Sequence, residues 1–242
     1  MTFHILLALA ALLAGAVASV VGFGIGSLLT PLLALRVGTQ LAVAAISIPH
    51  VFATALRFWR LRAHVDRRVL ISFGVTSAAG GLTGALLHSF ANNRALSIVF
   101  GLILIFVGVS EMTGLARRMQ FHGAVAWIAG AVSGLFGGLV GNQGGIRSAA
   151  LLGFDVDKQA FVATATAIGL VVDAARMPVY FATQALEITR IWLLILIATV
   201  GTLVGTLLGV RTLRRIPERV FRNIVAVVLL ALGAYMTFKG GA

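Results

Sequence analysis

Eight long apolar segments set the fold class of this chain. A helix needs about 20 apolar residues to cross a hydrocarbon core of roughly 30 Å. Four runs without a charged residue, His50 being counted as neutral, reach about that length, at residues 5–35, 37–56, 69–87 and 191–210. Four further runs lie at residues 95–110, 123–146, 159–172 and 223–238. We therefore predict an all-α polytopic membrane protein in which residues 1–242 form a single membrane domain.

The composition agrees with a membrane protein and argues against other classes. Hydrophobic residues make up 60% of the chain and charged residues 11%, whereas soluble domains carry roughly 25% charged residues. The formal net charge of +12 comes from arginines in short loops between apolar runs, where cytoplasmic loops of membrane proteins carry them. We therefore expect the lipid bilayer, and no nucleic acid, as a partner. The absence of cysteine removes disulfides, thiol catalysis and cysteine metal sites.

The first apolar run has one feature of a secretory signal peptide. Ala14-Gly-Ala-Val-Ala18 resembles a cleavage site, but residues 1–4 lack the Lys or Arg of a signal peptide, and the apolar run continues past the site. We expect this run to be kept as part of a multi-pass protein of the cytoplasmic membrane.

The chain contains an internal repeat. Four pairs of residues in the same order are each separated by 119 positions: Gly22 and Gly141, Gly26 and Gly145, Leu32 and Leu151, and Arg57 and Arg176. Two later matches have larger separations, 121 for Gly80-xxx-Gly84 with Gly201-xxx-Gly205 and 125 for Arg94 with Arg219. We therefore predict two copies of a four-segment unit, at residues 1–116 and 120–242.

The distribution of arginine indicates how the two copies are oriented. Residues 57–68 and 211–222 each hold five arginines, and the positive-inside rule predicts that both stretches face the cytoplasm. The loops expected around residues 88–94 and 179–190 are poor in Lys and Arg. Five apolar segments separate the two basic stretches, so an odd number of these segments must fail to cross.

The Gly-rich centre of one segment, residues 137–147, is the candidate for an incomplete crossing. Each glycine costs a helix about 1 kcal/mol relative to alanine, so two half-helices around an unwound bend, buried in the bundle, fit this stretch better. By the repeat, residues 5–35 bend around Gly22-Phe-Gly-Ile-Gly26. Each copy then has one re-entrant hairpin and three crossings, and the copies are inverted, as in many secondary transporters. Eight simple spans are the alternative.

Both predicted bends are candidate anion-binding segments, because free N–H groups at helix N-termini attract anions. The predicted substrate-binding residues of the first bend are Gly22, Gly24 and Gly26, and those of the second are Gly141, Asn142, Gln143, Gly144, Gly145 and Arg147. The Arg147 guanidinium is suited to grip an oxyanion through two parallel hydrogen bonds. Close helix packing is the alternative for the glycines, and a snorkelling interfacial position is the alternative for Arg147.

Further polar residues are candidates within the apolar segments. Asp173 lies three residues before Arg176, so the two pair if they share a helix, and Arg176 is also a candidate anion ligand. Arg57 is expected to belong to its basic loop. His50 follows Pro49 inside an apolar run, where its ring either relays protons or packs as a neutral residue. His50 and Asp173 are thus candidates for coupling transport to an ion.

The glycine motifs resemble those of the TauE/SafE sulfite-exporter family. The first copy, Val21-Gly-Phe-Gly-Ile-Gly-Ser-Leu-Leu-Thr-Pro31-Leu-Leu, matches the Gly-rich signature of that family, and the second begins alike with Ser133-Gly-Leu-Phe-Gly-Gly. The second copy then departs, with Asn142-Gln-Gly-Gly-Ile-Arg147 in place of a plainer turn and Ala150 at the position of Pro31. The resemblance covers essentially the whole chain.

The resemblance implies a secondary transporter, expected to be an exporter, for sulfite or an organosulfonate-like anion, with no cofactor and no metal. A non-transporting scaffold or assembly subunit, whose glycines serve packing alone, is the alternative. The sequence has no metal-ligand cluster, phosphate loop or catalytic triad, and only seven Asp and Glu residues, so we do not expect an enzyme. A homodimer is compatible with the sequence.

Overall fold

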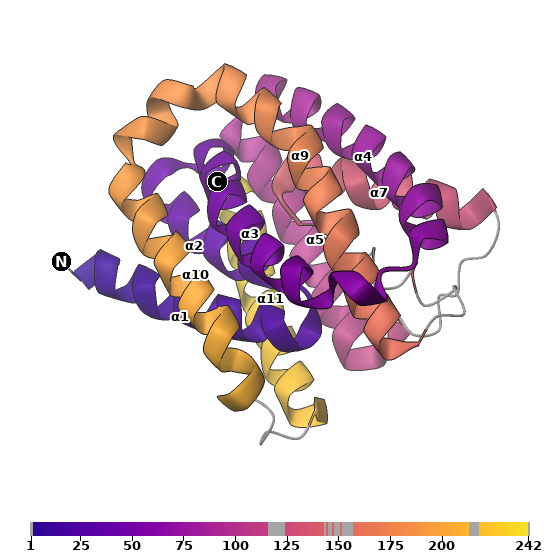
Figure 1. Ribbon diagram of the computed structural model, residues 1–242. Coiled ribbons are helices and arrows are strands. Elements are labelled where there is room, and N and C mark those ends of the chain that lie inside the picture. The colour runs from indigo at the N-terminus through magenta and orange to yellow at the C-terminus, as the bar shows by residue number, and fades with distance from the viewer. Residues whose placement is uncertain are drawn as a thin grey trace.

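The computed structural model describes residues 2–115, 124–142, 144, 147, 151, 157–212 and 218–241, and every element in them is a helix (Figure 1). The first half contains α1 (Thr2–Val21), α2 (Ile25–Val37), α3 (Thr39–Leu61), the 3-10 turn η1 (Arg62–His64), α4 (Arg67–Phe90) and α5 (Asn93–Thr113). The second half contains α7 (Ala124–Val140), α9 (Lys158–Arg190), α10 (Trp192–Thr212) and α11 (Glu218–Gly241).

Seven of the described helices, α1, α3 to α5 and α9 to α11, are long and apolar enough to cross a membrane. Their outer faces expose large hydrophobic side chains, among them Leu186, Trp192 and Phe238. A soluble protein rarely exposes so much continuous apolar surface, whereas lipid accommodates it. The predicted all-α polytopic membrane protein is therefore confirmed.

Helix α9 corrects one expectation. The apolar run at residues 159–172 is only part of a 33-residue helix, so the loop predicted at residues 179–190 is wrong. Pro178 lies inside this helix; a bundle tolerates such a residue where neighbouring groups satisfy the freed backbone. The one departure from helical geometry is at Gln184, with φ −138° and ψ 20°, which marks a kink.

Short polar side chains fix where several helices begin. The Asp66 side chain accepts a hydrogen bond from the Val69 amide at the start of α4 (3.1 Å), and the Asp157 carboxylate accepts from two amides at the start of α9. Such caps stabilise the first turn of a helix, and the two amides of α9 lower the pKa of Asp157. The Asp66 amide also donates to the Thr164 hydroxyl (2.9 Å), so α4 and α9 begin side by side.

The predicted helix breaks are present. Helix α1 ends at Val21 and α2 begins at Ile25, and the intervening Gly22 and Gly24 have φ of 88° and 131°. Helix α7 ends at Val140, and Gly141 follows with φ 73°. Only glycine adopts such positive values readily. Helix α1, with 20 residues, is longer than the expected half-helix, while α2 has 13 residues; the re-entrant path itself stays a prediction.

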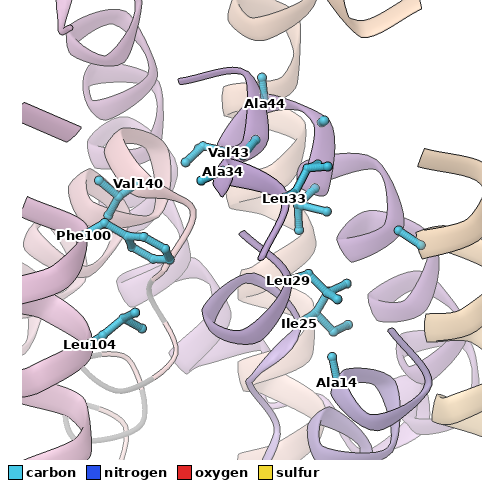
Figure 2. Close-up of a cluster of buried hydrophobic side chains, with 14 of the residues drawn as sticks. Ala14, Ile25, Leu29, Leu33, Ala34, Val43, Ala44, Phe100, Leu104 and Val140 are labelled. Atoms are coloured by element: carbon cyan, nitrogen blue, oxygen red, sulfur yellow. The ribbon is translucent and has the colours of Figure 1, made fainter. Parts of the chain in front are cut away.

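Helix α2 lies inside the bundle (Figure 2). Most of its residues are apolar and buried, and its exposed residues, Leu35 and Arg36, lie near its C-terminal end. Its buried Ile25, Leu29 and Leu33 belong to one core cluster with residues of the neighbouring helices, namely Val43, Ala44, Phe100, Leu104 and Val140. The N-terminus of α2, at the Gly24 break, is therefore held in the protein interior.

Glycines mark the close contacts between helices and correct the register of the repeat. A Cβ on Gly80 of α4 would meet the carbonyl oxygen of Ala131 in α7, and a Cβ on Gly205 of α10 would meet that of Leu12 in α1. Ala131 and Leu12 are 119 positions apart, whereas Gly80 and Gly205 are 125 apart. The contacts thus match Gly80 with Gly205 rather than with Gly201. The predicted match of Gly80 with Gly201 was therefore wrong by four residues. Four residues are about one helical turn, so Gly201 and Gly205 lie on the same face of α10.

Helices α5 and α11 pack against each other in opposite directions. A Cβ on Gly101 would lie 2.6 Å from the Gly233 oxygen, and one on Gly108 would lie 3.0 Å from the Ala226 oxygen. Residue numbers therefore rise along α5 as they fall along α11. Gly108 and Gly233 are 125 positions apart, so the predicted repeat would make α5 and α11 equivalent helices. Antiparallel packing of equivalent helices is what inverted repeats require.

Helix α4, in contrast, runs parallel to α9, and the path of the chain follows from this. A Cβ on Gly74 would lie 3.7 Å from Ile168, and one on Gly81 would lie 2.8 Å from Val172. Helix α10 then turns back after Ile191 (Figure 1). The end of α10 is thereby directed to the membrane face at which α4 begins.

Labelling of single cysteines tests this path. The chain has no native cysteine, so Ala63→Cys, Ala95→Cys and Arg215→Cys each provide one reactive position. We expect positions 63 and 215 on the cytoplasmic side and position 95 outside. In intact cells, a membrane-impermeant maleimide should label only the position 95 variant, and permeabilised cells should label all three. Opposite accessibility of positions 63 and 215 in intact cells would contradict the path.

Candidate functional site

Arg57 caps the end of α1 from inside the bundle. It lies in α3 and is only 7% exposed, with Nη1 donating to the Ala18 carbonyl oxygen and Nη2 to the Thr54 hydroxyl (3.3 Å). The same Ala18 oxygen accepts the Gly22 amide (3.0 Å). Its assignment to a basic loop was therefore wrong, because α3 extends to Leu61 and the last turn of α1 offers the guanidinium an acceptor.

Arg176 occupies the equivalent position in the second half. It lies in α9, is 2% exposed, and its Nη1 donates to the Gly137 carbonyl oxygen at the end of α7 (2.7 Å). That oxygen also accepts the Gly141 amide (3.0 Å). The last carbonyls of a helix lack helical partners, and lipid supplies none. Each arginine thus stabilises one helix break.

Two further carbonyls at the end of α7 are capped by neutral side chains. The Tyr180 hydroxyl donates to the Gly138 oxygen, and His88 Nδ1 donates to the Leu139 oxygen (2.8 Å). Because Nδ1 carries the proton of this bond, Nε2 of the neutral ring accepts, and Gln184 Nε2 lies 3.3 Å from it. The break after α7 is thus fixed by side chains of α4 and α9.

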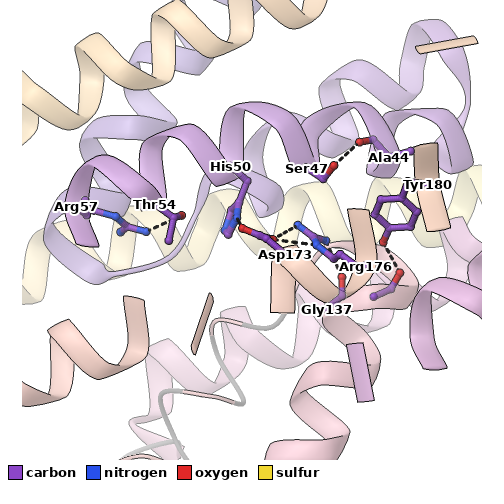
Figure 3. A network of polar contacts seen from close by, with 10 residues as sticks. Ala44, Ser47, His50, Thr54, Arg57, Gly137, Asp173, Arg176 and Tyr180 are labelled. Atoms are coloured by element: carbon purple, nitrogen blue, oxygen red, sulfur yellow. Dashed lines mark hydrogen bonds and ion pairs between the residues drawn. The ribbon is translucent and has the colours of Figure 1, made fainter. Parts of the chain in front are cut away.

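Asp173 joins α3 and α9 at the centre of this network (Figure 3). Its Oδ1 accepts from Arg176 Nε (2.9 Å) and lies 2.8 Å from Nη2, while its Oδ2 lies 2.7 Å from His50 Nδ1. The Asp173 side chain is fully buried, and that of His50 keeps 14% exposure. The predicted Asp173–Arg176 pair is confirmed. All three nitrogens of Arg176 are engaged, by Asp173 and Gly137.

Arg147 is buried without hydrogen-bond partners for two of its nitrogens. The residue is 4% exposed, and Nε and Nη1 have no partner. A Cβ on Gly169 of α9 would lie 3.1 Å from Arg147 Nη1 and 3.6 Å from the Thr54 methyl group. The guanidinium therefore occupies space that a side chain at position 169 would fill. Such burial contradicts the snorkelling alternative.

Unpartnered donors lie on α2, on α3 and on residues that follow α7. In the described part of the chain, five buried side-chain N or O atoms have no hydrogen-bond partner: Thr30 Oγ1, Arg57 Nε, Asn142 Nδ2, and Arg147 Nε and Nη1. Four of these are N–H groups that only donate, and a hydroxyl donates too. Leaving such groups unpaired costs about 1–3 kcal/mol each. Ligand oxygens that accept hydrogen bonds would remove this cost.

The buried charged groups of this region carry an excess of positive charge. The arginines buried in the described residues are Arg57, Arg147 and Arg176, and the buried carboxylate among them is Asp173. With the buried histidines neutral, these four groups carry two excess positive charges. A buried charge without a counterion is strongly unfavourable, so the region is suited to bind an anion.

The glycine segments meet one another. A Cβ on Gly26 would lie 2.5 Å from the Gly141 oxygen, and a Cβ on Gly144 would collide with the Phe23 side chain. The backbones of the two breaks thus touch, which side chains larger than hydrogen would prevent. Gln143 and Gly145, also predicted to bind substrate, lie outside the described residues.

Sequence reasoning missed several members of the network. Thr54, Gly169, Tyr180 and His88 carried no signal alone, because polar and small residues are scattered through the apolar runs. The repeat offers a signal for two of them, since Thr54 and Asp173, like His50 and Gly169, are 119 positions apart.

Comparison with known proteins agrees with the sequence resemblance. The family described as "Sulfite exporter TauE/SafE" matches residues 7–236, which confirms the resemblance. A curated protein of Bacillus subtilis (strain 168), "Probable membrane transporter protein YunE", is 25% identical, with 99% of each chain covered. No solved structure matches the chain.

A glycine pair tests the contact between the breaks. In Gly26→Ala the new methyl group would lie 2.5 Å from a backbone oxygen, so the breaks must move apart, and we expect a loss of about 1–3 kcal/mol in stability. In Gly74→Ala the nearest atom is the flexible Leu70 Cδ1 at 3.2 Å, and alanine favours a helix. Thermal unfolding in detergent should show a lower Tm only for Gly26→Ala. Equal melting temperatures would contradict the close contact.

Proposed function

Because the chain belongs to the sulfite exporter TauE/SafE family, we propose that it is a secondary transporter of a small sulfur-containing anion, such as sulfite or an organosulfonate. In this proposal the protein exports the anion across the cytoplasmic membrane. The Bacillus subtilis relative, named a probable membrane transporter protein, supports membrane transport. The observation that carries the anion assignment is the set of unpartnered N–H donors on Arg57, Arg147 and Asn142 inside a bundle with excess positive charge.

The donors suit an oxyanion. Sulfite and sulfonate groups each present three oxygens, which accept hydrogen bonds from several directions. Arg147 offers Nε and Nη1, and Arg57 offers Nε while its other nitrogens hold Ala18 and Thr54. Hydrogen bonds between ions are roughly twice as strong as neutral ones. One or two negative charges of the anion would offset the excess positive charge.

Arg176 has a different part in this proposal. Its nitrogens are held by Asp173 and the Gly137 oxygen, so it positions α9 against the end of α7 rather than binding substrate. The glycines Gly22, Gly24, Gly26, Gly141 and Gly144 act by letting the two breaks approach the donors. Arg147 and Arg57 are then the cations that meet the anion.

The proposal includes two inverted copies, at residues 1–116 and 120–242. Its support is the antiparallel packing of α5 with α11 and the matching caps, since Arg57 and Arg176 each reach a carbonyl 39 positions earlier in the chain. Rocking of inverted copies about a central site is the usual basis of alternating access. Broken helices that meet in the interior would place the anion between the copies.

A scaffold without transport is the second candidate, favoured by the glycines of α4 and α10, which serve close packing. Packing does not require buried arginines with unpartnered nitrogens. Ligand-dependent stability separates the two functions, since a protein that binds an anion is stabilised by it. Flux of sulfite and methanesulfonate in proteoliposomes tests transport itself.

Paired glutamine variants test the assignment of the arginines. Arg147→Gln removes a charge that has two unpartnered nitrogens, so binding of methanesulfonate should weaken by about 1.5–3 kcal/mol, roughly 10- to 150-fold in Kd, with Tm unchanged or higher. Arg176→Gln removes the positive charge that Asp173 pairs with and one of the two donors to the Gly137 oxygen, and should lower stability by about 3–5 kcal/mol. Equilibrium binding and thermal unfolding, measured on both purified variants, give the comparison.

Two results would overturn the assignment. An unchanged Kd in Arg147→Gln together with a large loss in a folded Arg176→Gln would move the site to Asp173 and α9. A wild-type protein that neither binds nor transports any of sulfite, sulfate and methanesulfonate, while remaining folded, would favour the scaffold.

A further inference from the structure

His50 stands at a position suited to exchange a proton inside the bundle. It lies near the middle of α3, directly after Pro49, and its side chain keeps 14% exposure while its partner Asp173 has none. The distance between His50 Nδ1 and Asp173 Oδ2 is 2.7 Å. His50 is one helical turn from Thr54 and two turns from Arg57, so it borders the donors assigned to the anion.

The hydrogen bonds define which ring nitrogen is open. Arg176 contacts Asp173 through two nitrogens, which keeps the carboxylate ionised and therefore only able to accept. His50 Nδ1 must then carry the proton of the His50–Asp173 bond. No group in the described part of the chain bonds to Nε2 of His50. A proton that arrives at His50 binds at Nε2 and creates an imidazolium beside the Asp173 carboxylate.

The surroundings of His50 make this protonation depend on the anion. The charged groups that act on it are Asp173 and Arg176 on α9 and Arg57 on its own helix. Elements α2, α5 and η1 also pack against α3. Their described titratable groups lie near helix ends or in η1, away from the middle of α3: Arg36, Arg62, His64, Arg94 and Glu111. The Asp173 carboxylate favours a positive charge on His50, whereas Arg176 and Arg57 oppose it. An anion bound by Arg57 and Arg147 would offset the opposing arginine charges and so favour protonation.

The repeat shows that the pair is not part of the common scaffold. The capping arginines occur in both copies, as Arg57 and Arg176. The position equivalent to His50 is Gly169, and the position equivalent to Asp173 is Thr54. Support of the helix breaks thus explains the arginines but not the histidine, because in the first half Arg57 caps α1 while its other hydrogen bond goes to the Thr54 hydroxyl.

We propose that His50, held by Asp173, binds a proton that is transported in the same direction as the anion. The proposal rests on the anion-transport function proposed above. Binding of the anion favours protonation of His50, and by thermodynamic reciprocity protonation favours the anion by the same factor. The carrier then changes access with both ligands or with neither, so export of the anion down its own concentration gradient carries a proton outward with it.

Methanesulfonate is the probe for the test, because its sulfonate group stays ionised between about pH 5.5 and pH 8, where histidine titrates. We expect the wild-type protein to bind it at least about fivefold more tightly at the lower pH, a typical coupling. In proteoliposomes, an imposed pH gradient should drive its accumulation, with proton movement reported by an internal pH dye.

The decisive variant is His50→Gln, whose amide still donates to Asp173 but does not titrate. Its binding should lose the pH dependence, and a pH gradient should no longer drive accumulation, while exchange of labelled for unlabelled methanesulfonate continues. His88→Gln is the matched control, a second buried histidine that caps a backbone oxygen; its binding should keep the pH dependence. Thermal unfolding of both variants verifies that they are folded.

The outcomes separate the two proposals. If the wild-type protein binds and exchanges methanesulfonate without pH dependence or proton movement, the proton site is wrong and the anion function stands. The proton site is also wrong if His50→Gln keeps the pH dependence or His88→Gln loses it. If the wild-type protein neither binds nor exchanges the anion, the function itself fails.

Discussion

A helix that stops inside a membrane protein must find partners for its last carbonyl groups, and this requirement organises the whole bundle. Water is not available in the hydrocarbon core, and each unsatisfied group costs several kcal/mol there. Here Arg57 donates a hydrogen bond to a carbonyl in the last turn of α1, and Arg176 donates one to a carbonyl in the last turn of α7. Because each arginine must reach from a long helix nearby, α3 and α9 are fixed against the breaks, and α2 packs against α3 and α1.

Capping alone does not explain why arginines were used. At the end of α7 the Tyr180 hydroxyl and the His88 ring satisfy two carbonyls without adding a charge. Arginine brings a formal charge into the interior, and an unbalanced one is costly. Asp173 balances one of three, and the nitrogens left unpartnered on Arg57 and Arg147 point to the missing acceptor. The arginines that cap the helix breaks thereby make the interior positively charged and rich in hydrogen-bond donors. Such an interior is suited to bind an anion.

Local patterns in the sequence were sufficient to predict that the helices and the breaks exist, but not where α3 and α9 end or how the helices contact one another. Apolar runs and clustered glycines predict the elements, and three-residue spacing predicts the Asp173–Arg176 pair. The runs do not show where α3 ends, so Arg57 was assigned to a loop. The burial of Arg147 depends on space left by Gly169, and the His50–Asp173 contact joins residues 123 positions apart. Such contacts come from packing of the two halves, which no single segment encodes.

Comparison of equivalent positions separates scaffold from chemistry. The break glycines Gly22 and Gly141 and the capping arginines occur twice, and a scaffold element must occur twice if both breaks are to be stable. Arg147 replaces Leu28, Asp173 replaces Thr54, and Gly169 replaces His50 at the 119-residue offset. Each exchange is matched by another across the interface: Gly169 leaves room for Arg147, and Asp173 is the acceptor for His50. Paired differences of this kind are expected if one bound anion and one proton are held between two otherwise similar halves, since a single central site cannot be duplicated.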